Sequence, residues 1–107
     1  MKDTTFIVET GTIWYSCFND NSDITITYEI NSDNPVNLLF TPTKQDAEGI
    51  ISTNVTSINT YPSCYVPNAL STKGQCIISG KGCMVLENSK ETDARVNLKS
   101  KEVVINA

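Results

Sequence analysis

The side chains that most often do chemistry in proteins are scarce in this sequence, which has four cysteines and no histidine. Histidine is the usual general base, the usual partner of a nucleophilic serine or cysteine, and a common zinc ligand. No two of the cysteines form the close pair that a structural zinc site needs. The pattern also places no two carboxylates in one pocket as an acid and a base. We therefore expect a protein that is not an enzyme and that binds neither a metal nor a cofactor.

Two local patterns resemble ligand loops but are better explained as turns. The segment from Gly74 to Gly82 contains glycines and a lysine, yet it lacks the first glycine and the hydroxyl residue of a phosphate-binding loop. The segments at residues 19–23 and 31–34 are rich in Asn and Asp, whose oxygens suit calcium, but neither fits the EF-hand pattern. We predict a tight hairpin turn around Gly80 and polar turns at both Asn/Asp-rich segments.

The cysteines bear on the compartment in which the protein works. The four are Cys17, Cys64, Cys76 and Cys83, and they allow three pairings if all are bridged. Bridges form in oxidising compartments, whereas in the cytosol these residues would be free, buried thiols. Asn54 begins an Asn-Val-Thr glycosylation sequon. Together these features favour a secreted or extracytoplasmic protein, with a cytoplasmic location as the alternative.

Length and charge exclude several classes of partner. A chain of 107 residues has the size of one domain, and we expect a single domain over residues 1–107. The formal net charge of -4 argues against nucleic acid, for which a basic face is expected. No apolar run approaches the roughly 20 residues needed to cross a bilayer, so we expect no membrane span.

An alternating segment at residues 23–30 is the clearest structural signal. Apolar side chains fall on one face of an extended strand and polar ones on the other, the apolar set being Ile24, Ile26, Tyr28 and Ile30. Turn residues bracket this segment on both sides, at 19–22 and 31–35. One face of the strand must therefore pack against the rest of the chain.

Further short strands are expected along the chain, separated by turn signals. Their ranges are 4–9, 12–18, 36–41, 50–55, 76–79, 83–88 and 94–98, with a bulge or strand end near 101–102 before 103–105. The pattern predicts an all-β fold, a single antiparallel β-sandwich of seven to eight short strands.

The densest aromatic stretch lies at residues 12–18. Trp14 and Phe18 share one face of the predicted strand, with Ser16 between them. We predict that a large aromatic ring anchors the core here. The alternative is that Trp14 and Tyr15, if exposed, form a platform for a sugar or a peptide.

A long irregular loop is predicted at residues 60–75, which contain two prolines and a glycine and show no sustained period. Apolar side chains in such a loop have no strand to bury them, so they are candidates for a contact surface. The predicted partner-binding residues are Tyr61, Tyr65, Val66, Leu70 and Lys73. The alternative is that the tyrosines fold back and cap an open end of the sandwich.

Three parts of the sequence resemble the GOLD (Golgi dynamics) domain: Ser16-Cys17-Phe18 ahead of Tyr28-Glu29-Ile30, the segment from Asn34 to Phe40, and Gly82 to Asn88 followed by Ala94 to Leu98. That domain is a β-sandwich found in early-secretory cargo receptors and in some cytosolic lipid-transfer and adaptor proteins. Luminal members place a cysteine where this chain has Val85. Cys83 lies two residues earlier on the same strand face, so the resemblance implies a displaced Cys17–Cys83 bridge.

The preferred pairing is accordingly Cys17–Cys83 with Cys64–Cys76, the second closing the irregular loop at its base. For function, we expect a non-catalytic binding module of adhesion or cargo type that recognises a protein or a glycan. The alternative is a structural subunit of a surface or coat assembly that self-assembles through sheet edges.

Overall fold

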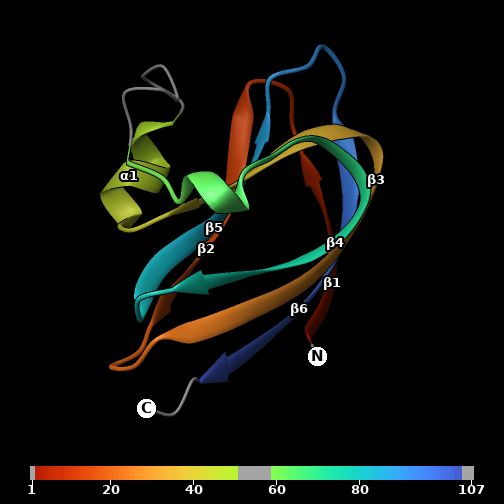
Figure 1. Cartoon of the computed structure of the whole chain (residues 1–107). Coiled ribbons are helices and arrows are strands. Elements are labelled where there is room, and N and C mark those ends of the chain that lie inside the picture. The colour runs from red at the N-terminus through yellow and green to blue at the C-terminus, as the bar shows by residue number, and fades with distance from the viewer. Residues whose placement is uncertain (1, 51–58, 105–107) are drawn as a thin grey trace.

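The computed structural model describes residues 2–50 and 59–104, and this part of the chain forms six strands, one α-helix and one 3-10 helix. The elements are, in chain order, β1 (Lys2–Val8), β2 (Thr12–Asn19), β3 (Ile24–Thr41), α1 (Lys44–Gly49), η2 (Pro62–Cys64), β4 (Val66–Ile78), β5 (Lys81–Asn88) and β6 (Ala94–Val104). The strands make one antiparallel sheet in the order β1-β6-β3-β5-β2, and β4 also pairs with β3 (Figure 1). The prediction of an all-β antiparallel fold is confirmed.

The sheet is built around β3, which has 18 residues and pairs with three other strands. Along one edge of β3, residues 24–32 pair with β6 and residues 37–41 pair with β5. β4 follows the opposite edge past both parts, with shifts of register where β3 changes partner. In Figure 1 β3 (orange to yellow) bends near its label, so that both of its ends point to the same side. The sheet therefore curls back on itself.

The predicted turn at residues 31–35 is a bend inside β3 and not a chain reversal. In the described part of the chain no strand pairs with Asp33, Asn34 or Pro35, because β6 stops pairing before them and β5 starts after them. The Asn34 amide instead donates to the carbonyl oxygen of Asp93 at 2.9 Å. Proline lacks the N–H that a ladder needs, so it is tolerated where the ladder is interrupted.

One hydrophobic core fills the inside of the curl. The four apolar side chains of residues 23–30 that we predicted to face the core all belong to β3. They are Ile24, Ile26, Tyr28 and Ile30, and none of them is more than 5% exposed. The other core residues come from β1, β4, β5, β6 and the second part of β3, and they are Val8, Val36, Leu38, Phe40, Ala69, Cys76, Ile78, Met84, Leu86, Ala94, Val96 and Leu98. The core face predicted for residues 24–30 is therefore confirmed.

Helix α1 covers the outer face of the sheet where β3 pairs with β5. Thr43 begins it as the N-cap, and its hydroxyl oxygen accepts from the Asp46 backbone N–H at 3.1 Å. Ala47 and Ile50 pack with the outward side chains of the two strands in a second small cluster, whose buried strand members are Leu39, Cys83 and Val85. This half of the sheet is thus buried on both faces.

The prediction of an irregular loop at residues 60–75 is wrong, because β4 occupies most of that range. Its buried positions, Ala69, Cys76 and Ile78, are few and unevenly spaced, so periodicity does not reveal the strand. Its partner β3 decides its conformation, as is usual for strands. At Gly74 a Cβ would lie 2.6 Å from the Tyr28 hydroxyl oxygen, so any larger residue there would require the Tyr28 ring to shift.

Other strand predictions also need correction. The described residues contain six strands in one curled sheet, not seven to eight, since the predicted strands at 23–30 and 36–41 are one strand and a strand at 76–79 is the end of β4. β6 pairs with β3 without a shift across residues 101–102, so no bulge is present there. Of the strand predicted at 50–55, Ile50 is the C-cap of α1, and the rest lies outside the described residues.

Candidate functional site

Both disulfides that the structure contains follow the preferred pairing. Cys17 and Cys83 face each other across the β2–β5 ladder with their Cα atoms 4.0 Å apart. Cys64 of η2 is joined to Cys76 of β4, with a Cα separation of 5.7 Å. None of the four cysteines is free. Two disulfides suggest an oxidising, extracytoplasmic environment.

In the described residues, no helix is long and apolar enough to cross a membrane.

The predicted partner-binding residues do not share one environment. Tyr61 is half-buried against the core, and its hydroxyl lies 3.4 Å from that of Ser79. Val66 pairs with β3, and the Lys73 ammonium contacts a Glu29 carboxylate oxygen at 3.1 Å. Tyr65 and Leu70 are each 45% exposed. A partner surface at residues 60–75 stays a prediction. The structure places these residues at η2 and on β4, which is an edge strand. The sequon at Asn54 lies outside the described residues.

The two tyrosines of this segment should differ in single replacements. We expect Tyr61→Ala to lower the free energy of unfolding by about 2 kcal/mol, because it truncates a ring packed on the core. Tyr65→Ala, the matched control on an exposed ring, should change it by less than about 0.5 kcal/mol. Urea denaturation of both variants provides the measurement. Equal losses would contradict the assignment of Tyr61 to the core and Tyr65 to the surface.

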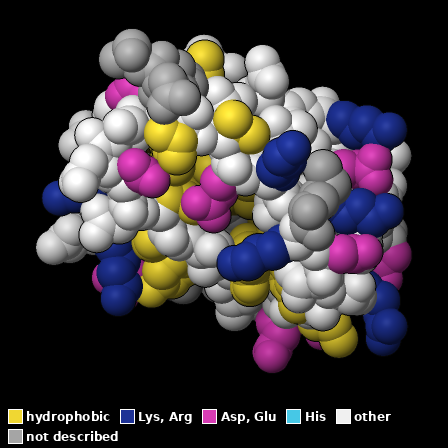
Figure 2. Space-filling view, turned by 90° about the horizontal axis from the view of Figure 1, so that it is seen from below, with side chains coloured by type: hydrophobic (Ala, Val, Ile, Leu, Met, Phe, Trp, Pro, Cys, Tyr) yellow, Lys and Arg dark blue, Asp and Glu magenta, His cyan; other side chains and the backbone are white. Residues whose placement is uncertain are grey.

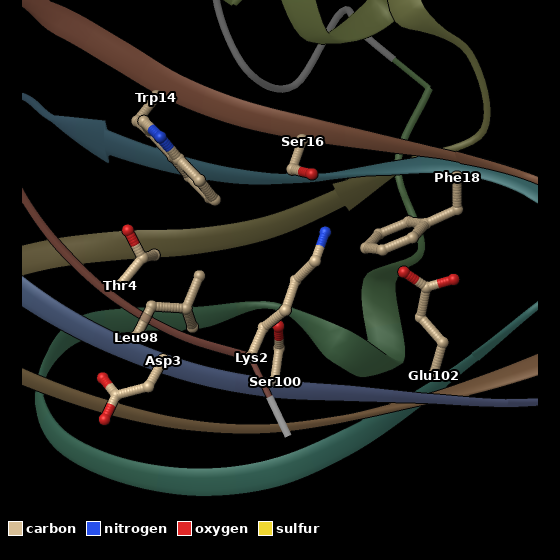
Figure 3. Close-up of a pocket in the computed structure, with 9 residues that line it drawn as sticks. All are labelled: Lys2, Asp3, Thr4, Trp14, Ser16, Phe18, Leu98, Ser100 and Glu102. Atoms are coloured by element: carbon tan, nitrogen blue, oxygen red, sulfur yellow. The ribbon is translucent and has the colours of Figure 1, made fainter.

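A cleft opens inside the curl where β2 faces β1 and β6 without pairing to them (Figure 3). It has a volume of about 380 Å³, within the range of small-molecule sites. β2 forms one wall, and β1 and β6 form the other. The lining residues are Lys2, Asp3, Thr4, Trp14, Ser16, Phe18, Leu98, Ser100 and Glu102. Figure 3 shows the β2 side chains pointing toward those of β1 and β6, whereas Asp3 points away.

The cleft exists because the inward face of these strands changes from apolar to polar along its length. On β1 the inward positions run from Val8 and Phe6 to Thr4 and Lys2. On β6 the same alternation runs from buried Leu98 to Ser100 and Glu102, which are not buried. Lys2, Thr4 and Glu102 are exposed, so the inward face is open to solvent at this end of the curl. Polar side chains at inward positions mark this end of the curl as a candidate site.

The hydroxyl groups of the cleft are not used by the fold. Among the described residues, the side chains of Thr4, Ser16 and Ser100 have neither a hydrogen bond nor an ion pair. Lys2 and Glu102 carry opposite charges, but neither takes part in an ion pair within the described part of the chain. The Asp3 carboxylate is engaged outside the cleft, where it accepts from the Asn97 amide at 2.8 Å. The other polar groups are free to meet a ligand.

The aromatic wall is held in place by the fold. The Trp14 ring stacks on Phe6 with ring centroids 4.3 Å apart and planes 16° apart. Trp14 and Phe18 are both partly buried against the core, as the prediction of an aromatic anchor requires. Tyr15 lies on the opposite face of β2, where its hydroxyl donates to Glu48 of α1 at 3.3 Å. Trp14 and Tyr15 therefore do not form a common platform.

Sequence reasoning missed this cleft, although two signals were present. Lys2 and Thr4 are in phase with Phe6 and Val8, and Ser16 separates Trp14 from Phe18. Each is a polar residue in phase with apolar residues of its own strand. What the sequence could not supply is that β1 and β2, although consecutive, stay unpaired and leave a gap between their inward faces.

A second surface, the outer face of β6, β3 and β4, carries charges in register. Glu29 of β3 lies between Lys73 of β4 and Lys99 of β6, at 3.1 and 3.8 Å. Basic and acidic side chains alternate along the right-hand side of the view in Figure 2. Behind Glu29, burial raises the pKa of the Tyr28 hydroxyl above its ordinary value. The two lysines outnumber the one carboxylate, so these charges do not cancel.

Comparison with known proteins does not identify the chain. No model of a protein family matches it, and a search among curated proteins finds no significant relative. The resemblance to the GOLD domain therefore stays a prediction that rests on the segments quoted above.

Proposed function

We propose that the protein is a non-catalytic binding module, secreted or otherwise extracytoplasmic, that holds its ligand in the cleft between β2 and the β1–β6 pair. The observation that carries this proposal is the set of polar side chains at inward positions, with hydroxyl groups that no other described residue engages. Because Lys2, Thr4 and Glu102 are exposed and Ser16 and Ser100 are partly buried, a ligand that enters the cleft can reach these groups. The two disulfides support the extracytoplasmic location.

The proposal agrees with the resemblance to the GOLD domain, which implies a β-sandwich of the kind found in cargo receptors. The two parts of the curl, one around β6 and one around β5, would be its two layers, with β3 shared between them. No cofactor, metal or nucleic acid enters this proposal. The partner would be a protein or a glycan, bound through the part of it that enters the cleft.

An NMR screen tests the proposal. The isotope-labelled protein is mixed with a library of small saccharides, short peptides and fatty acids, and the backbone amide shifts are followed. We expect at least one class to shift the amides of β1, β2 and β6 around the cleft and to remain chemically unchanged over days. Conversion of the bound compound would show an enzyme. A screen in which no compound shifts the cleft amides would overturn the binding proposal.

A second candidate, a structural subunit, is favoured by one observation. β4 is a strand of 13 residues that pairs only with β3 within the described part of the chain, and its Leu70 and Ile77 are exposed. A long edge with apolar side chains can pair with a neighbouring chain. Sedimentation over a hundredfold range of protein concentration separates the candidates. A binding module stays monomeric, whereas a subunit assembles as the concentration rises.

A further inference from the structure

We propose that the cleft binds a neutral saccharide, such as a terminal hexose or a disaccharide of a glycan. This inference rests on the proposed function and adds the class of ligand. It is carried by three features of the cleft: free hydroxyl groups on facing strands, two aromatic side chains on the β2 wall and, because Asp3 points away, one inward charge of each sign.

Hydroxyl groups line both walls of the cleft. Ser16 lies on β2, and Thr4 and Ser100 lie on β1 and β6 (Figure 3). A hydroxyl group both donates and accepts, and its hydrogen rotates to suit a partner. Sugar hydroxyl groups have the same property, so each pair can form a hydrogen bond in either direction. Because the three side chains have no partner among the described residues, a sugar would not displace a bond within the protein.

The aromatic wall suits the apolar side of a sugar ring. Trp14 and Phe18 stand four residues apart on β2, on one face and on either side of Ser16. Their side chains point into the cleft (Figure 3). Aromatic rings bury a large apolar area and are rigid, so little conformational entropy is lost when a ligand lies against them. The Phe6 stack restricts Trp14 further. The β2 wall thus offers stacking, and both walls offer hydrogen bonding.

The charges of the cleft favour a neutral ligand. Lys2 repels a cation and Glu102 repels an anion, and both line the cleft. The formal net charge of -4 further disfavours a phosphate or another anion. Ammonium and carboxylate groups can still bind the hydroxyl groups of a neutral sugar as donor and acceptor. A peptide of either charge would meet one attractive and one repulsive group in a cleft of about 380 Å³, so its charge brings no net gain.

The test uses Trp14, which is the only tryptophan in the sequence and reports on the cleft. Neutral hexoses, N-acetylhexosamines and their disaccharides are titrated into the oxidised protein while tryptophan fluorescence is recorded. Glucuronate, a primary amine and tripeptides of matched size are titrated in parallel. We expect saturable fluorescence changes with at least one neutral saccharide, and weaker or no changes with the charged probes and the peptides. NMR shifts of the cleft amides locate the binding.

Matched variants test which groups carry the binding. Ser16→Ala and Ser100→Ala should each weaken the saccharide by about 5-fold, the value of one neutral hydrogen bond. Ser71→Ala removes a hydroxyl on β4, outside the cleft, and should leave binding unchanged. Glu102→Gln keeps an acceptor and should change saccharide binding by less than about 3-fold, whereas it would abolish binding of a cationic ligand. Equal melting temperatures show that each variant is folded.

Three outcomes overturn one or both proposals. If peptides or fatty acids shift the cleft amides and no saccharide does, the ligand class is wrong and the binding module stands. If a saccharide binds but Ser16→Ala and Ser100→Ala have no more effect than Ser71→Ala, the sugar lies elsewhere and this site is refuted. If no probe of any class shifts the cleft amides, the inference and the proposed function both fail.

Discussion

Replacing Ile26 with aspartate should unfold the protein. The Ile26 side chain is fully buried in the core, and its strand position pairs with Cys76 of β4 and Glu102 of β6. A carboxylate there would lose its hydration with no cation to pair with it, and the apolar contacts of isoleucine would be lost as well. Such changes cost more than about 4 kcal/mol, a large part of the 5–15 kcal/mol that stabilises a domain of this size. Loss of the near-ultraviolet circular dichroism of the folded protein at 25 °C is the measurement.

The neighbouring residue gives the control. Thr27 points to the outer face of the sheet and is not buried, and its strand partners are Gln75 and Lys101. Thr27→Asp therefore places the same charge in water beside a lysine, and we expect a change below about 1 kcal/mol. If both variants melt within a few degrees of the parent, the assignment of Ile26 to the core is wrong. If Thr27→Asp also unfolds, the outer face is buried in the protein as it exists in solution.

The alternation of residues 23–30 correctly predicted their core face. β4 and β6 pair with the two edges of this strand, so one of its faces packs on the core. The turn residues at 31–35 led to a wrong prediction, because Asn and Pro bend β3 there and do not reverse it. Turn propensity reports local backbone preference, and it cannot show that strands on both sides hold the chain extended. The two predicted segments form one strand because β6 pairs with the first of them and β5 with the second. Both β5 and β6 come later in the sequence.

The candidate site was less predictable than the fold, for a related reason. Trp14, Ser16 and Phe18 could be placed on one face of a strand from their spacing alone. Part of the opposite wall comes from Ser100 and Glu102, which are more than eighty positions away in the sequence and show no pattern that points to β2. The site depends on how far the sheet curls, a property set by the bend in β3 and by which strands remain unpaired.

Removing the Cys17–Cys83 bridge should destabilise the protein by about 4 kcal/mol, and more than removing Cys64–Cys76. The sequence separations are 66 and 12 residues, and the chain-entropy model gives a larger cost for the longer closed loop, by roughly 1.5 kcal/mol. The β2–β5 ladder keeps its strand pairing without the bridge, so the folded state should survive in Cys17→Ala/Cys83→Ala. The effect acts mainly on the unfolded chain, which becomes more expanded.

Urea denaturation of the two double variants measures this effect. We expect the loss of stability to be larger for Cys17→Ala/Cys83→Ala than for Cys64→Ala/Cys76→Ala, with a steeper dependence on urea in the first because its unfolded chain exposes more surface. Peptide mapping without reduction provides an independent control of the pairing. A peptide that joins Cys76 to Cys83 would contradict the structure, because the two lie on opposite edges of β3 and their strands do not pair in the described sheet. A loss that is equal for both variants would show instead that the bridges act on contacts of the folded state and not on the freedom of the unfolded chain.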